Sequence, residues 1–201
     1  MKYDTLIRQA LIIDGSNTEG FVADVGLRGG RIETIGDLSS AQAEHEVAAN
    51  GRVLAPGFID VHTHDDTVVI RQPQMLPKLS QGVTTVIVGN CGISASPVSL
   101  RSDPPDPMNL LGTREAFSYP RFADYCAAVQ RAGPAVNVAA LIGHTALRSN
   151  HMDDLHRTAT PYEIAAMRVQ LQESLEAGAL GLSTGLAYAS AFSAETDEVL
   201  Q

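Results

Sequence analysis

Two histidines separated by one residue are the sharpest chemical signal in the sequence. His62 and His64 follow Asp60 at a spacing of two. On a strand these three side chains share one face, and burying Ile59 and Val61 against outer helices would turn both imidazoles inward. Two neutral imidazoles a few ångström apart form a natural chelating pair for zinc. The alternative is a pair of solvent-facing histidines at the end of a strand.

A cysteine follows a second apolar run. Cys91 comes directly after the segment 82–89 and Asn90, and it precedes Gly92. We expect it at the same edge of a parallel sheet as the histidines, where a nearby cation would hold it as a thiolate. A buried structural cysteine is the alternative. Thiolate and imidazole ligands favour zinc over magnesium, while iron and nickel stay open.

Two further polar residues follow a third apolar run. His144 either lines a substrate cavity or is a hydrogen-bonded structural histidine. Arg148 can bind a substrate carboxylate through two parallel hydrogen bonds, or it can pair with a protein carboxylate. The second cysteine, Cys126, lies on the apolar face of a predicted helix and is expected to belong to the core.

The segment from residue 57 to the end predicts parallel strands. Its apolar runs at 58–62, 82–89, 136–143 and 179–184 are separated by helical segments, a pattern typical of strands with helical crossovers. The helix before the fourth run is the best defined, because Thr160, Pro161 and Glu163 form a capping box with proline in its first position. Four such strands are half of an eight-stranded barrel. We therefore predict an α/β fold, a partial (β/α)8 TIM-like barrel, for residues 57–201.

Residues 1–56 show a different pattern. Short β-branched segments are broken by turn residues, and Gly29-Gly30 predicts a two-residue hairpin. A small antiparallel β-sheet domain is expected here, ahead of the barrel strands.

Composition restricts the partners. The 201 residues are 44% hydrophobic and 18% charged, as in ordinary globular proteins. A net charge of −9, from 14 Lys and Arg against 23 Asp and Glu, disfavours nucleic acid and anionic membranes. The start of the chain lacks the pattern of a signal peptide, no stretch approaches a membrane span, and two cysteines do not suggest a disulfide framework. The expected location is the cytoplasm.

Several segments resemble one enzyme family. Pro56-Gly-Phe-Ile-Asp-Val-His-Thr-His64 resembles the first-strand signature of the amidohydrolase superfamily. The segments 82–92, 143–148 and 181–188 resemble the N-acyl-D-amino-acid deacylases, or D-aminoacylases, and the whole chain is similar to the N-terminal part of that family.

The resemblance implies a function and a set of roles. Cys91 would be a metal ligand beside His62 and His64, and Tyr188 would lie near the substrate, unless it only caps the core. A zinc-activated water would remove the acyl group from N-acyl-D-amino acids. The family's general-base Asp and two further metal histidines would lie beyond residue 201, so the catalytic residue is unknown here. Residues 1–201 alone are expected to be inactive, and either to be marginally stable or to self-associate, because an open sheet edge is left unpaired.

Two alternatives stay open at this point. One is a cyclic-amide hydrolase of the dihydroorotase or hydantoinase type, against which the segment around Cys91 argues. The other is a noncatalytic half barrel that binds a metal or a partner.

Overall fold

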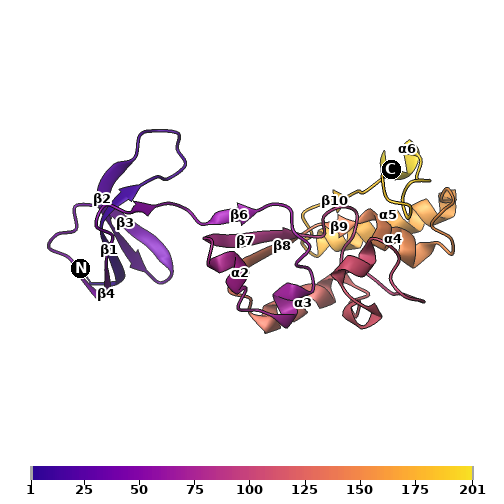
Figure 1. Cartoon of the computed structure of the whole chain (residues 1–201), viewed down its shortest axis with the longest axis horizontal. Coiled ribbons are helices and arrows are strands. Elements are labelled where there is room, and N and C mark those ends of the chain that lie inside the picture. Colours follow the sequence, from indigo (N-terminus) through magenta and orange to yellow (C-terminus); the bar gives the residue numbers. More distant parts are fainter. Residues whose placement is uncertain (1, 201) are drawn as a thin grey trace. The chain divides into compact units, whose positions relative to one another are not determined.

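The computed structural model describes residues 2–200 (Figure 1). The chain divides into two compact units, Met1–Gly57 and Phe58–Gln201, and each is described by itself.

The first unit is a five-stranded sheet in which the strands pair in the order β3-β2-β1-β4, with β5 also against β1. Its strands are β1 (Lys2–Ile12), β2 (Phe21–Arg28), β3 (Arg31–Gly36), β4 (Gln42–Ala48) and β5 (Val53–Leu54). The predicted hairpin is confirmed: β2 and β3 are antiparallel around Gly29 and Gly30, whose φ angles of 57° and 72° suit glycine.

The prediction of an antiparallel sheet is wrong for β4 and β5. β4 and β5 run parallel to β1, so the sheet is mixed. After β3 the chain crosses to the other side of β1, and Arg8 of β1 donates hydrogen bonds to the carbonyls of Leu38 at 2.6 Å and Ala41 at 2.9 Å. A crossover held by contacts between distant residues leaves no local turn signal, which explains the error.

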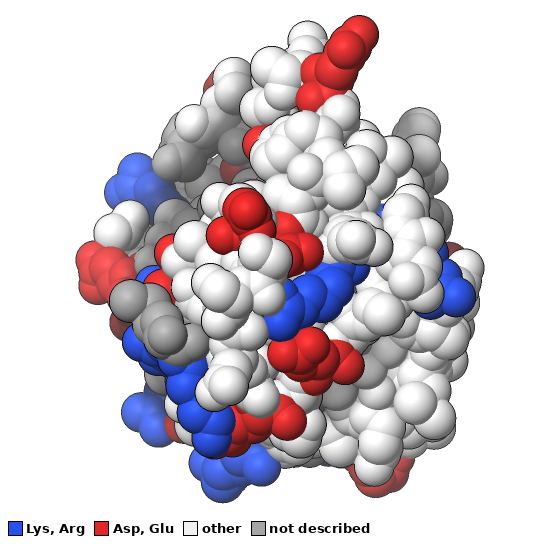
Figure 2. Space-filling model, turned by 90° about the vertical axis from the view of Figure 1, so that its left-hand side faces the viewer, with Lys and Arg blue, Asp and Glu red and all other residues white. Residues whose placement is uncertain are grey.

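Charged side chains of both signs are mixed on this unit. Arg8 contacts Glu46 at 2.9 Å and Asp24 at 3.4 Å, and Lys2 contacts Glu44 at 3.1 Å. Figure 2 shows basic and acidic side chains next to one another on the viewed face, with wide uncharged areas between them. The viewed face thus carries charges of both signs.

The second unit contains parallel strands, as predicted. Figure 1 shows β6 (Phe58–Asp60), β7 (Val83–Val88) and β8 (Asn137–Ala140) side by side, and both of their pairings are parallel. β9 (Ile142–Gly143) pairs in parallel with β10 (Leu182–Ser183) in a separate two-stranded sheet. The result is a mixed α/β unit.

Helices and short 3-10 turns connect these strands. They are α1 (Val68–Arg71), α2 (Leu76–Leu79), η1 (Met108–Leu111), η2 (Arg114–Ala116), α3 (Phe122–Ala132), α4 (His144–His151), α5 (Pro161–Glu176) and α6 (Thr196–Leu200). Within residues 2–200, every helix is too short or too polar to cross a lipid bilayer.

The core of the second unit joins the sheet to α3 and α5. Val86 and Val88 of β7 pack in one cluster with Tyr125 of α3 and Met167 of α5. Cys126 is half-buried and packs against the same cluster. The capping box of α5 is confirmed, because Thr160 and Glu163 bond reciprocally.

The strand that leads to the histidines is shorter than predicted. β6 ends at Asp60, and Ile59 and Val61 are 59% and 63% exposed. Within the described residues β6 pairs with β7 alone, and these two side chains stay largely exposed. Beyond Asp60 a backbone bond from the Thr63 amide to the Ile87 carbonyl at 3.3 Å keeps the chain beside β7. His62 and His64 therefore lie on the segment that follows the strand.

Candidate metal centre

The three predicted metal ligands come together in the second unit. One potential ligand atom from each of His62, His64 and Cys91 lies within 4.8 Å of the other two. The Nε2 atom of His62 is 3.0 Å from Cys91 Sγ, and the two imidazole rings meet edge to face with centroids 5.7 Å apart. Thiolate sulfur and imidazole nitrogen are the donor types that zinc prefers.

Cys91 lies in a tight turn just after β7. Its φ angle is 57°, in the left-handed region that residues with a side chain rarely adopt. The Asn90 amide group bonds the Ile87 carbonyl at 2.8 Å and the Thr63 carbonyl at 3.4 Å, and so ties this turn to the histidine segment. The turn reverses the chain directly after the strand, which brings the thiol beside His62.

The state of His64 suits a metal ligand. Burial, together with the charge of neighbouring His62, lowers the pKa of His64 below its usual range and favours the neutral ring. Its Nδ1 atom is buried and has no hydrogen-bond partner among the described residues. An unpaired buried nitrogen is unfavourable unless something binds it, so the donors present fit a divalent cation.

One lysine holds the carboxylates on either side of the histidines. Lys78 Nζ lies 2.6 Å from Asp60 and 3.0 Å from Asp65, and it donates to Thr63 Oγ1 at 3.3 Å. The hydrogen bond from Lys78 lowers the pKa of the Asp60 carboxyl. Both carboxylates are thus committed to an ion pair.

A third carboxylate is buried beneath the cluster. Asp66 is 1% exposed and accepts hydrogen bonds from the amides of Gly89 at 3.3 Å and Ala95 at 3.1 Å. Burial raises the pKa of Asp66 to about 6. Sequence reasoning missed this residue, because the pair Asp65-Asp66 carries no signal that tells which member points inward.

His144 and Arg148 belong to a buried ion-pair network. His144 Nε2 lies 2.9 Å from Glu198 Oε1, and the Arg148 guanidinium pairs with the same carboxylate. Arg148 is 0% exposed. Its remaining bonds go to backbone carbonyls, those of Ser190, Leu155 and Arg157. Of the two predictions for Arg148, the structure shows the protein carboxylate as its partner and leaves the guanidinium no open face for a substrate.

Tyr188 lies against the Cys91 turn. The negative charge of the Cys91 thiolate raises the pKa of the Tyr188 hydroxyl above its usual range. A Cβ added at Gly185 would stand 2.7 Å from Cδ2 of the Tyr188 ring and would also collide with the Cys91 carbonyl oxygen. Gly185 therefore allows the segment after β10 to pack directly on the cysteine turn.

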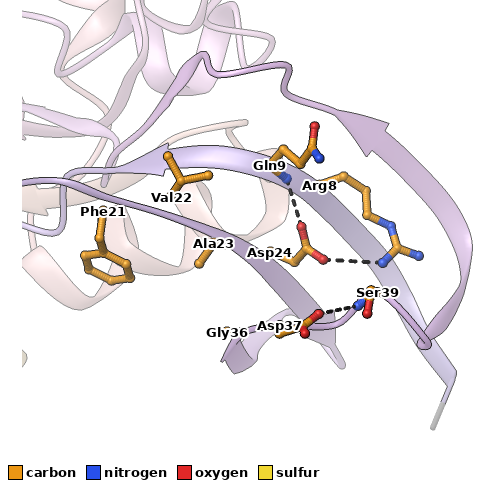
Figure 3. Close-up of a pocket in the computed structure, with 9 residues that line it drawn as sticks. All are labelled: Arg8, Gln9, Phe21, Val22, Ala23, Asp24, Gly36, Asp37 and Ser39. Carbon is orange, nitrogen blue, oxygen red and sulfur yellow. Dashed lines mark hydrogen bonds and ion pairs between the residues drawn. The ribbon is translucent and has the colours of Figure 1, made fainter.

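A cavity in the first unit has none of these residues in its lining. It has a volume of about 740 Å³, and Figure 3 shows Arg8 and Asp24 pointing toward one another within it. Asp24 also accepts from the Gln9 amide at 2.8 Å, and Asp37 from the Ser39 amide at 3.0 Å. Each of these charged side chains already has an ion-pair or backbone partner, so the cluster around Cys91 is the better candidate site.

Comparison with known proteins decides the family. Residues 45–201 match the Amidohydrolase family. The chain belongs to the amidohydrolase family. The match covers the second unit and the end of the first, including the two histidines and the cysteine.

Among amidohydrolases, the chain is similar to the D-aminoacylases. It is 49% identical over 199 residues to a D-aminoacylase of Alcaligenes xylosoxydans xylosoxydans, which covers 99% of this chain and 41% of the relative. A crystal structure of D-aminoacylase superposes with a TM-score of 0.95 at 46% identity, over 98% of this chain and 42% of the other.

A third comparison includes a metal. An N-acyl-D-glutamate deacylase from Bordetella bronchiseptica, complexed with zinc and a phosphonate mimic of the tetrahedral intermediate, superposes with a TM-score of 0.94 at 44% identity, over 99% of this chain and 42% of that protein. The amidohydrolase chain thus has the fold of the TIM-barrel superfamily and spans about two fifths of the relatives it matches.

Proposed function

We propose that the whole protein to which this chain belongs is a zinc-dependent N-acyl-D-amino-acid deacylase, a hydrolase of linear amide bonds. The observation that carries the proposal is the convergence of His62, His64 and Cys91 within 4.8 Å. The similarity to D-aminoacylase over almost the whole chain supports it.

The three residues would hold one zinc ion through two nitrogens and a sulfur. When bound, the ion supplies Lewis-acid polarisation of an acyl carbonyl and makes an attacking water more acidic. Burial keeps the His64 ring neutral, so that a ring nitrogen retains the lone pair that binding needs. Cys91 would bind as the thiolate, whose charge offsets part of the charge of the cation.

The proton-accepting residue is proposed to lie outside these 201 residues. Three carboxylates flank the cluster, and each has another partner. Asp60 and Asp65 pair with Lys78, while Asp66 is buried and accepts two backbone amides. A general base needs a carboxylate free to take the proton of a water, and none of these three is free.

Tyr188 is the residue we propose to contact the substrate. It is half-buried and lies beside Cys91, so that its hydroxyl could donate to an oxygen of the N-acyl amino acid. His144 is proposed to act indirectly, by holding Glu198 and with it the segment that follows Tyr188. Arg148 has no place in substrate binding in this proposal.

The strand arrangement supports a partial barrel. We propose that β6, β7, β8 with β9, and β10 correspond to the first four strands of a (β/α)8 barrel. Leu141 donates to the Val88 carbonyl and Leu180 to the Ala140 carbonyl, which links the two short sheets across β8 and β9. The divisions 1–56 and 57–201, the cytoplasmic location and self-association of the chain stay predictions of the sequence.

The cyclic-amide alternative is not favoured. The relatives named above act on, or are named for, N-acyl-D-amino acids, and they match over almost the entire chain. A noncatalytic half barrel would not need the hydrogen bonds by which Asn90 and Asp66 join the histidine segment to the cysteine turn.

A substrate panel tests the proposal. The whole protein, loaded with zinc, is assayed against N-acyl amino acids of both chiralities and against hydantoin and dihydropyrimidine rings. We expect turnover of N-acyl-D-amino acids and discrimination against the L forms. Faster turnover of a cyclic amide than of every N-acyl-D-amino acid would overturn the assignment.

A further inference from the structure

A single carboxylate joins the two ends of the turn that carries Cys91. Asp66 Oδ2 accepts from the Gly89 amide at 3.3 Å, and Oδ1 accepts from the Ala95 amide at 3.1 Å. Gly89 and Ala95 bracket Cys91, which lies between them in a left-handed conformation. The two bonds close this loop across its base.

The same carboxylate is tied to the histidines through the chain. Asp66 is two residues after His64 in the sequence. Its side chain therefore connects the histidine segment to the turn after β7 that carries Cys91. The surroundings of the Asp66 carboxylate are unusual for a charged group. Asp66 is 1% exposed, and among the described residues it forms no ion pair with a Lys, Arg or His. Burying a carboxylate without a cation is strongly unfavourable, and backbone donors are its whole compensation here.

A strained turn needs such a support. The backbone of Cys91 is in a region that is costly for a residue with a side chain, and it persists where the surroundings fix it. With the turn released, the thiol could move away from His62 Nε2, which it now meets at 3.0 Å. Residues that do not bind the metal but hold its ligands in position commonly influence metal affinity.

We propose that Asp66 is a positioning residue that fixes the Cys91 thiolate in register with His62 and His64 for binding a divalent cation. It does not touch the cation itself. The inference rests on the proposed function, because it takes these three residues to be the ligands. It adds a fourth residue whose role is exercised through the backbone of the cysteine turn.

Cobalt binding by the whole protein provides the test. Co²⁺ bound to a thiolate has a ligand-to-metal charge-transfer band that zinc lacks, so the band reports the Cys91 contact without any assay of activity. Asp66→Asn keeps the size of the side chain but replaces one acceptor by a donor that faces a backbone amide. We expect the band to weaken or shift and zinc affinity, from competition with a chelator, to fall by about 10- to 100-fold.

A matched control separates positioning from general stability. Tyr125 donates from its hydroxyl to the backbone carbonyl of Asp66 at 2.8 Å. Tyr125→Phe removes a buried hydrogen bond at the same residue and leaves both contacts of the carboxylate in place. We expect a lower melting temperature with an unchanged cobalt band and zinc affinity.

Two further variants keep the outcome decisive. If Asp66→Asn does not fold, Asp66→Glu retains both oxygens but displaces them by a methylene, and a perturbed band is again expected. A folded Asp66 variant with the wild-type band and with zinc affinity within twofold overturns the inference. Cys91→Ala separates failure of the proposed metal site from failure of the role of Asp66. If Cys91→Ala also leaves the cobalt band unchanged, Cys91 is not a ligand and the proposed metal site itself is wrong.

Discussion

The Nε2 atom of His62 lies 3.0 Å from Sγ of Cys91, although 29 residues separate the two along the chain. The contact exists because β6 and β7 are parallel neighbours, so that the segments after them leave the sheet at the same edge. His64 completes the cluster, with ligand atoms within 4.8 Å. Four experiments follow from this geometry and from the elements around it, all on the whole protein.

The two cysteines allow a direct comparison. Cys91→Ala removes the sulfur donor, and we expect zinc affinity to fall by more than about 100-fold, beyond the loss typical of residues that merely support a ligand. Cys126→Ala changes a half-buried cysteine in the core cluster and should leave zinc affinity unchanged. Metal content after dialysis and a chelator competition measure both. Equal zinc affinity in the two variants would contradict the metal role of Cys91.

Arg148 and Glu198 form a fully buried ion pair. Arg148→Met leaves the Glu198 carboxylate buried without its cation, which should lower the free energy of unfolding by about 3–5 kcal/mol. Arg121→Met is the control: the Arg121 side chain is 77% exposed and pairs with Asp124 at 2.9 Å, so a change below about 1 kcal/mol is expected. Urea denaturation of both variants gives the comparison. A loss for Arg148→Met as small as that of the control would show that the pair is not buried.

The pH dependence of helix α5 should follow Glu163. The Arg157 guanidinium and the Thr160 amide lower the pKa of Glu163 to about 2. Because the folded pKa is lower than the ordinary value of 4.5, ionised Glu163 stabilises the fold above pH 4.5. This stabilisation is lost as the pH falls from there through about 2.

Glu163→Gln tests this dependence. The variant should be less stable than wild type at pH 7, and the difference should shrink steadily below pH 4.5. Hydrogen exchange of the amides in the first turn of α5 measures the effect locally. Glu173→Gln, on the exposed face of the same helix, should show no such trend. A difference between wild type and Glu163→Gln that is independent of pH would exclude the ion pair as its cause.

Adding one methyl group at Gly185 tests its close approach to the cysteine turn. In Gly185→Ala the new Cβ would collide with the Cys91 carbonyl oxygen and stand 2.7 Å from the Tyr188 ring, so the turn or the tyrosine must move. We expect at least a tenfold loss of kcat/KM, in keeping with the sensitivity of catalysis to displacements of about 1 Å. Gly133→Ala introduces backbone strain at a φ of 59° but meets nothing within 4 Å, and it should retain activity. Wild-type kcat/KM in Gly185→Ala would refute the contact.

Several features could be predicted from the sequence because they depend on neighbouring residues. The hairpin at Gly29-Gly30 and the capping box of Thr160 and Glu163 follow from backbone preferences within four residues. The parallel strands follow from the alternation of apolar runs with helical segments. The donor types of His62, His64 and Cys91 likewise indicate zinc independently of their geometry.

The tertiary structure decided how distant segments meet. The parallel return of β4 beside β1 and the pairing of Arg148 with Glu198 each join residues far apart along the chain. The end of β6 at Asp60 was also not visible in the sequence pattern. The inward direction of Asp66, rather than Asp65, was decided in the same way, by backbone amides more than 20 residues away. A local pattern specifies what a side chain can bind, but its partner is selected by packing of the whole unit, because burial and hydrogen bonding are satisfied together across the core.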